Sequence, residues 1–117
     1  MLEDKLRNKP MDNKLPDFIA ILNYKLAEEG GRKTPAHTGY RPAIKFNFSD
    51  KQTTGQQTFI NRDLVYPGES VKAAIKIASP NLFEKSLAEG MVFEFKEGQV
   101  IIGTGQIIEI INKKLKK

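Results

Sequence analysis

The residues best suited to binding chemistry gather in one short stretch of the chain. Arg32, Lys33 and Arg41 lie within ten residues of one another, and Tyr40 precedes Arg41 directly. Guanidinium groups form paired hydrogen bonds with phosphate oxygens, and aromatic faces suit ribose. These residue types indicate a surface that could contact RNA. A structural role is the alternative, because Arg41 comes directly before Pro42 and could brace its own loop.

Residues for catalysis do not assemble into a set. His37 is the only histidine and cysteine is absent, so a catalytic relay or a metal cluster would rest on one loop residue. The carboxylates at Glu28–Glu29, and at Glu94 and Glu97, have no obvious apolar pocket beside them. The sequence Gly103-Thr104-Gly105 is followed by neither the lysine nor the helix of a phosphate-binding loop. We therefore expect no enzyme, no catalytic residues, no cofactor and no metal.

The length and composition of the chain indicate how many domains it forms and which class of partner its charge favours. With 117 residues, 28% charged and 39% hydrophobic, the chain suits one folded domain with its own core. The formal net charge of +5 favours polyanions or acidic protein faces as partners. No apolar run long enough to span a bilayer occurs, so we expect a cytoplasmic protein that contacts no membrane.

Alternating apolar residues indicate that short β-strands carry the binding residues. The clearest pattern runs from Val71 to Ile77, where Val71, Ala73, Ile75 and Ile77 are expected to face the core. Further strands are expected at residues 18–26, 44–48, 57–60, 91–96 and 100–111.

Glycine and proline mark the expected turns between these strands. The polar segment Ser49–Gln56 is expected to be a turn, and Tyr66-Pro67-Gly68-Glu69 has β-turn chemistry. Glu97-Gly98 is expected to connect the last hairpin. Gly103 and Gly105 share one strand face, which indicates a close backbone approach or a barrel corner.

The chain therefore divides into an all-β domain with two short flanking segments. About six short antiparallel strands are typical of a small sandwich or barrel. One short helical turn is expected near residues 82–88, with Asn81 as its cap. We expect a flexible N-terminal arm at residues 1–16, the folded domain at residues 17–111 and a basic C-terminal tail at residues 112–117.

Several motifs resemble those of one known family. The sequence EGGRKTP at residues 29–35, followed by GYRP at residues 39–42, resembles the signature that opens the C-terminal domain of elongation factor Tu. Residues 53–55, 66–69, 96–98 and 103–105 are similar, in order, to the VTG, MPGD, REG and GAG elements of that family. The resemblance spans residues 17–111 and implies a six-stranded antiparallel β-barrel.

The resemblance also implies positions for a partner. In that family the domain follows a GTPase domain and a second barrel, and it lies along the T stem of tRNA. The positions similar to its contacts are Thr54, Glu97 and the backbone around Gly98. Together with the basic residues and Tyr40, they give the candidate RNA or partner site Arg32, Lys33, Tyr40, Arg41, Thr54, Lys96, Glu97 and Gly98.

Two functions of different class stay open from the sequence. As a nucleic-acid module, the barrel would bind tRNA or another structured RNA through backbone contacts. As a protein-interaction module, it would imitate the surface of the translation factor and act on a translation-related protein as an adaptor, decoy or competitor. Both functions are binding functions without catalysis.

We expect the protein neither to bind nor to hydrolyse GTP, because it lacks the glycine-rich loop and the lysine that hold the phosphates. Isothermal titration calorimetry with GTP at micromolar protein should give no saturable heat. A saturable binding curve would contradict this expectation.

Overall fold

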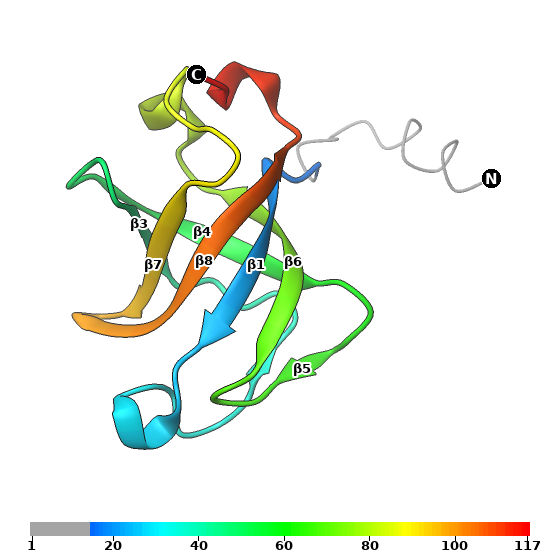
Figure 1. The fold of residues 1–117 in the computed structure, drawn as a ribbon, viewed down its shortest axis with the longest axis vertical. Coiled ribbons are helices and arrows are strands. Elements are labelled where there is room, and N and C mark those ends of the chain that lie inside the picture. The colour runs from blue at the N-terminus through cyan, green and yellow to red at the C-terminus, as the bar shows by residue number, and fades with distance from the viewer. Residues whose placement is uncertain (1–14) are drawn as a thin grey trace.

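A closed antiparallel barrel forms the body of the molecule, as the family resemblance implied (Figure 1). The computed structural model describes residues 15–117, so most of the expected N-terminal arm lies outside the described residues. The barrel strands follow the order β1-β6-β4-β3-β7-β8, and β2 pairs with β5 in a separate two-stranded sheet. The strands are β1 (Phe18–Tyr24), β2 (Ala36–His37), β3 (Ala43–Phe46), β4 (Gln52–Phe59), β5 (Leu64–Val65), β6 (Ser70–Ile77), β7 (Val92–Glu97) and β8 (Val100–Ile110).

The inward side chains of the six barrel strands fill one core. On β6, alternate residues from Val71 to Ile77 are buried, which confirms the strand face expected from the sequence. Rings from three strands meet edge to face near the centre: Phe18 lies 6.1 Å from Phe46 and 5.7 Å from Phe93, between ring centroids. Such aromatic contacts add to the hydrophobic free energy of burial.

The close backbone approach expected at Gly103 and Gly105 is found only at Gly103, beside the Asn23 carbonyl, and both glycines pack against aromatic side chains. Phe95 of β7 pairs opposite Gly103, and Phe93 pairs opposite Gly105. A Cβ atom at either glycine would overlap the ring that faces it. The two glycines therefore leave the space that the two phenylalanine rings occupy.

Two of the expected turns are also confirmed. In Tyr66–Glu69, the amide of Glu69 donates to the carbonyl of Tyr66 at 3.0 Å, and Gly68 has a φ of +89°. Gly98 has a φ of +61° between β7 and β8. These are backbone conformations that glycine adopts at little cost.

The turn expected at Ser49–Gln56 is wrong for most of its length, because β4 already begins at Gln52. Gly55 lies inside β4, opposite Ile77, and a Cβ atom there would overlap the Ile44 side chain. This glycine makes room for a core residue instead of forming a turn. The neighbouring strands are also shorter than expected, since β1 ends at Tyr24 and β3 at Phe46.

The helical turn expected near residues 82–88 is present but lies earlier, at Pro80–Phe83, and is a 3-10 turn. Proline is favourable in a first helical turn because its φ is already fixed there. Asn81 does not cap the turn, since it lies within it. Leu87 instead forms an isolated bridge with Lys116. Two further 3-10 turns occur at Ala27–Glu29 and Lys113–Leu115.

The C-terminal segment 112–117 makes contacts with the end of the barrel. Leu115 is fully buried and its carbonyl accepts the amide of Leu87 at 2.8 Å. The lysines of the segment are exposed. Within residues 15–117, no helix is long and apolar enough to cross a membrane.

Replacing Ile75 with alanine tests the barrel register. Ile75 is fully buried, so the cavity should lower the free energy of unfolding by about 2 to 5 kcal/mol in urea unfolding. Lys76→Ala on the outer face of the same strand is the control and should change it by less than about 0.5 kcal/mol. Equally mild effects of both substitutions would contradict the register.

Candidate functional site

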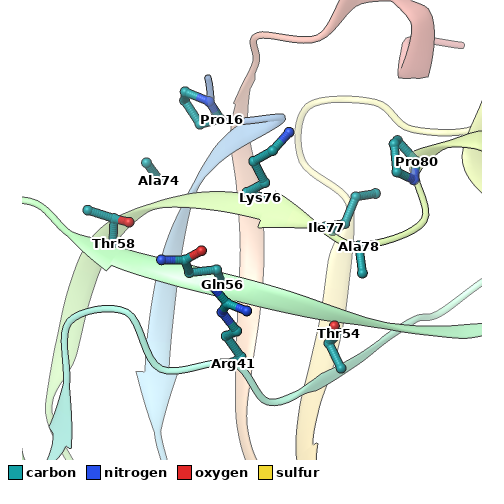
Figure 2. Close-up of a pocket in the computed structure, with 10 residues that line it drawn as sticks. All are labelled: Pro16, Arg41, Thr54, Gln56, Thr58, Ala74, Lys76, Ile77, Ala78 and Pro80. Carbon is teal, nitrogen blue, oxygen red and sulfur yellow. The ribbon is translucent and has the colours of Figure 1, made fainter. Parts of the chain in front are cut away.

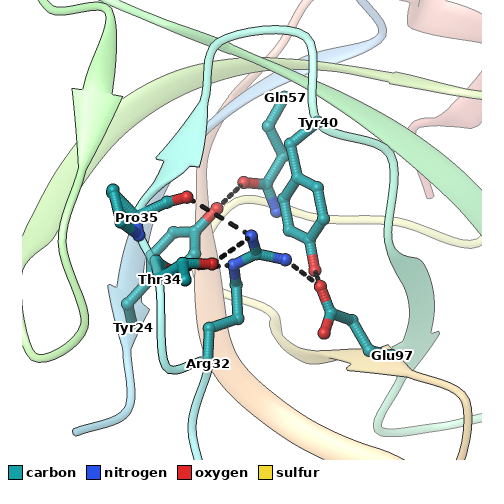
Figure 3. Close-up of polar contacts among 7 residues, drawn as sticks. All are labelled: Tyr24, Arg32, Thr34, Pro35, Tyr40, Gln57 and Glu97. Atoms are coloured by element: carbon teal, nitrogen blue, oxygen red, sulfur yellow. Dashed lines mark hydrogen bonds and ion pairs between the residues drawn. The ribbon is translucent and has the colours of Figure 1, made fainter. Parts of the chain in front are cut away.

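Three of the predicted site residues meet at one end of the barrel (Figure 3). Arg32 comes from the loop after β1, Tyr40 from the segment before β3, and Glu97 from the end of β7. The Oε2 atom of Glu97 accepts hydrogen bonds from Arg32 Nη1 and from the Tyr40 hydroxyl. The guanidinium carbon of Arg32 also lies 4.7 Å from the centroid of the Tyr40 ring, which adds a cation–π contact. We call these three residues the end cluster.

The remaining donors of Arg32 are used within its own loop. Nε donates to the Thr34 carbonyl at 3.2 Å, and Nη2 donates to Thr34 Oγ1 at 3.2 Å and to the Pro35 carbonyl at 3.3 Å. All three guanidinium nitrogens therefore have partners inside the protein. Arg32 holds the loop onto the barrel, and its charge is already paired with Glu97.

The protonation of the end cluster follows from burial and contacts. Burial raises the pKa of Tyr40 above its ordinary value, and its hydrogen bond to Glu97 adds to the shift. Burial opposes the charge of Arg32, but the contacts with Tyr40 and Glu97 outweigh it and raise the Arg32 pKa. Arg32 therefore stays charged and Tyr40 stays protonated at neutral pH. Neither group can act there as a general base.

A buried polar pair lies near the end cluster (Figure 3). The Tyr24 hydroxyl donates to Oε1 of Gln57, which is fully buried. Burial is also the main reason that the Tyr24 pKa is raised. Among the described residues, no acceptor is found for Nε2 of Gln57. Sequence reasoning missed this pair, and its only signal was a glutamine at an inward position of a strand.

A second group of predicted residues lies on the outer surface of the barrel. Thr54 of β4 pairs opposite Ala43 of β3, and Ala43 pairs opposite Lys96 of β7. Directly paired residues point to the same side of a sheet, so Thr54 and Lys96 share the outer face on either side of Ala43. Arg41 lines a groove together with Thr54 (Figure 2).

The predicted site thus divides into two groups instead of forming one patch. The end cluster has its polar groups turned toward one another, whereas Arg41, Thr54 and Lys96 face outward. Lys33 is exposed in the same loop as Arg32, and Gly98 lies in the turn that follows Glu97.

Within residues 15–117, no group of three or more His, Cys, Asp or Glu side chains could hold a metal ion. His37 is exposed on the short strand β2, as expected for a solvated loop residue. Fold and site together define a small closed barrel with polar and cationic groups on its surface.

The family comparison agrees with this class. The model of the elongation factor Tu C-terminal domain matches residues 13–111. The chain belongs to this family, and it is a translation-factor-like module. The domain of this family is a non-catalytic barrel, whereas the GTPase activity of the factor belongs to another domain.

Arg32→Ala should lower the free energy of unfolding by about 1 to 3 kcal/mol, because it removes an ion pair, three hydrogen bonds and a ring contact. Urea unfolding measures the loss, and Lys33→Ala, in the same loop, is the control with an expected change below about 0.5 kcal/mol.

A double-mutant cycle with Glu97→Gln isolates the pair. The side chains of Arg32 and Glu97 are 19% and 43% exposed, so solvent screening should limit their coupling to about 0.5 to 1 kcal/mol. Fully additive losses would show that the two side chains act independently in solution.

Proposed function

We propose that this chain is an RNA-binding module of the translation apparatus, with tRNA as the first candidate ligand. It holds structured RNA against the outer surface of four consecutive strands, β6-β4-β3-β7. The family membership supports the link to translation. The charge distribution over the barrel supports the choice of surface.

Cationic side chains gather on one side of the barrel. The outer surface of β6-β4-β3-β7 carries four lysines, whereas the exposed or half-buried carboxylates of these strands are Glu94 and Glu97, and Glu97 is already paired with Arg32. Strands β1 and β8 contain no lysine or arginine. This asymmetry is the observation that carries the proposal, because phosphate attraction supplies most of the sequence-independent affinity for RNA. The four lysines are Lys45, Lys72, Lys76 and Lys96.

The same outer surface offers groups for ribose. Thr54 is exposed between the cations and carries a hydroxyl that can donate and accept a hydrogen bond. A ribose 2′-hydroxyl needs such a partner, and double-stranded RNA is bound mainly through 2′-hydroxyl and phosphate contacts. Lys96 supplies a charge on β7, which is separated from β4 by β3. Thr54 and Lys96 are therefore the residues we assign to direct contact.

The end cluster has a positioning role in this proposal. Arg32 and Tyr40 fix Glu97, and thereby the turn that contains Gly98, beside the outer surface. The side chain of Glu97 is still 43% exposed, so its second oxygen can accept a 2′-hydroxyl. Lys33 and Arg41, which follow Arg32 and Tyr40 in the sequence, are exposed and add positive charge.

A protein partner is the second candidate, and the surface opposite the lysines favours it. The outer side of β1 and β8 carries Ile19, Ile21 and Ile108, of which Ile108 is 38% exposed. This surface has no cation on its strands and mixes isoleucines with neutral polar residues and Glu109, which suits a protein interface better than RNA. In this case the barrel would engage a translation-related protein.

Titrating salt into a tRNA binding assay distinguishes the two candidates. Fluorescence anisotropy with labelled tRNA should show binding that falls steeply between about 50 and 200 mM salt, as phosphate contacts predict. Lys96→Glu should weaken binding and lower the salt slope by about one. Thr54→Val should weaken binding without changing the salt slope.

Lys117→Glu is the matched control, because it makes the same charge change at the exposed C-terminus, which lies at the opposite end of the barrel from the β7–β8 turn near Lys96 (Figure 1). Equal weakening by Lys117→Glu and Lys96→Glu would mean that net charge, and not this surface, governs binding. Absence of tRNA binding by the wild type at low salt would reject the RNA function and leave the protein partner.

A further inference from the structure

A groove on the outer surface of β4 and β6 has the character of a binding site. Its volume is about 830 Å³, and it is lined from β4, from β6 and from the segment before β3 (Figure 2). Only Arg41 and Thr54 among its lining residues belong to the candidate binding site predicted from the sequence. Gln56 and Lys76 also line the groove and match no sequence motif.

Two cations flank one amide in this groove. Lys76 of β6 pairs directly opposite Gln56. On the other side of β4, the segment of Arg41 pairs with the same stretch, since Gln57 N donates to the Tyr40 carbonyl at 2.8 Å and Gly55 N to the Pro42 carbonyl at 3.0 Å. Arg41 and Lys76 therefore lie on opposite sides of Gln56, with backbones about 10 Å apart, twice the spacing of paired strands.

Neither cation is neutralised by the described part of the chain. Among the residues that the structure describes, no carboxylate lines the groove. Neither Arg41 nor Lys76 takes part in an ion pair among residues 15–117, whereas Arg32 and Arg62 each have a glutamate partner. As far as residues 15–117 are concerned, the groove thus presents two positive charges without an acidic partner, which makes it complementary to an anion with more than one charge.

A row of neutral polar groups runs between the cations. Thr54, Gln56 and Thr58 alternate along β4 and all line the groove, so the row is about 13 Å long. Hydroxyl and amide groups both donate and accept hydrogen bonds. Small side chains, Ala74 and Ala78, form part of the opposite wall on and after β6 and leave space for a ligand backbone.

We propose that this groove holds the sugar–phosphate backbone of an RNA strand. Arg41 and Lys76 bind phosphate oxygens, and Gln56 with its threonine neighbours binds ribose 2′-hydroxyls, which distinguish RNA from DNA. This inference rests on the proposed RNA function and extends it: the bound strand crosses β4 toward β6, and Gln56 and Lys76 become contact residues.

The test compares a groove lysine with a lysine outside the proposed RNA-binding surface, in the full chain. Binding of a short RNA duplex is measured by anisotropy across a salt series for Lys76→Ala and Lys117→Ala. Lys117 is exposed and belongs neither to the groove nor to the four strands of the outer surface, so it is the matched control. Lys76→Ala should weaken binding and lower the salt slope by about one, while Lys117→Ala should leave the slope unchanged. Equal slopes for the two variants would overturn the inference.

A DNA duplex of the same sequence tests the role of the amide. The wild type should prefer the RNA duplex, and Gln56→Ala should reduce that preference while keeping the salt slope. An unchanged preference in Gln56→Ala would reject the ribose contact. Urea midpoints of all variants serve as the folding control.

The possible outcomes distinguish a failure of the groove hypothesis from a failure of the proposed RNA-binding function. Wild-type RNA binding that depends on Lys96 but not on Lys76 or Gln56 would reject the groove and keep the proposed function. Absence of RNA binding by the wild type would reject both.

Discussion

The packing of two phenylalanine rings onto two glycines is the constraint on which the rest of the barrel depends. Phe93 and Phe95 point inward from β7, and only Gly105 and Gly103 on β8 leave room for them. A closely packed interior tolerates no overlap of this kind, so β7 and β8 can pair in this register only with glycine at both positions. The register in turn fixes Glu97 at the end of β7, where Arg32 binds it.

The inward packing of these strands also determines which side chains lie on the outer surface of the barrel. Because successive residues of a strand point to opposite sides, filling the core with Phe93 and Phe95 sends Lys96 outward. The same rule places Thr54 and Lys76 outside on β4 and β6. The positions of the outward cations therefore follow from the packing of the inward side chains on the same strands. Arg32 differs, since its charge stabilises the loop.

Much of the fold could be predicted from sequence because its signals are local. The alternation from Val71 to Ile77 and the turn at Tyr66–Glu69 depend on neighbouring residues alone. The spacing of the glycines at 103 and 105 indicated a close approach, and the ordered motifs indicated a six-stranded barrel. Local signals gave a wrong prediction where the same residue type occurs both in turns and inside strands. Gly55 suggested a turn, but it lies in β4 because Ile44 needs the space.

The sequence by itself determined the family, the alternating strands and the residue types available for binding. Only the tertiary structure decided which of these residues meet. Closure of the barrel brings Arg32 to Glu97 across 65 residues, and it places Arg41 and Lys76 on either side of Gln56. The alternation of apolar residues predicts whether a side chain points inward or outward. Its neighbours, however, are determined by strand order and register, which depend on contacts between residues far apart in the chain.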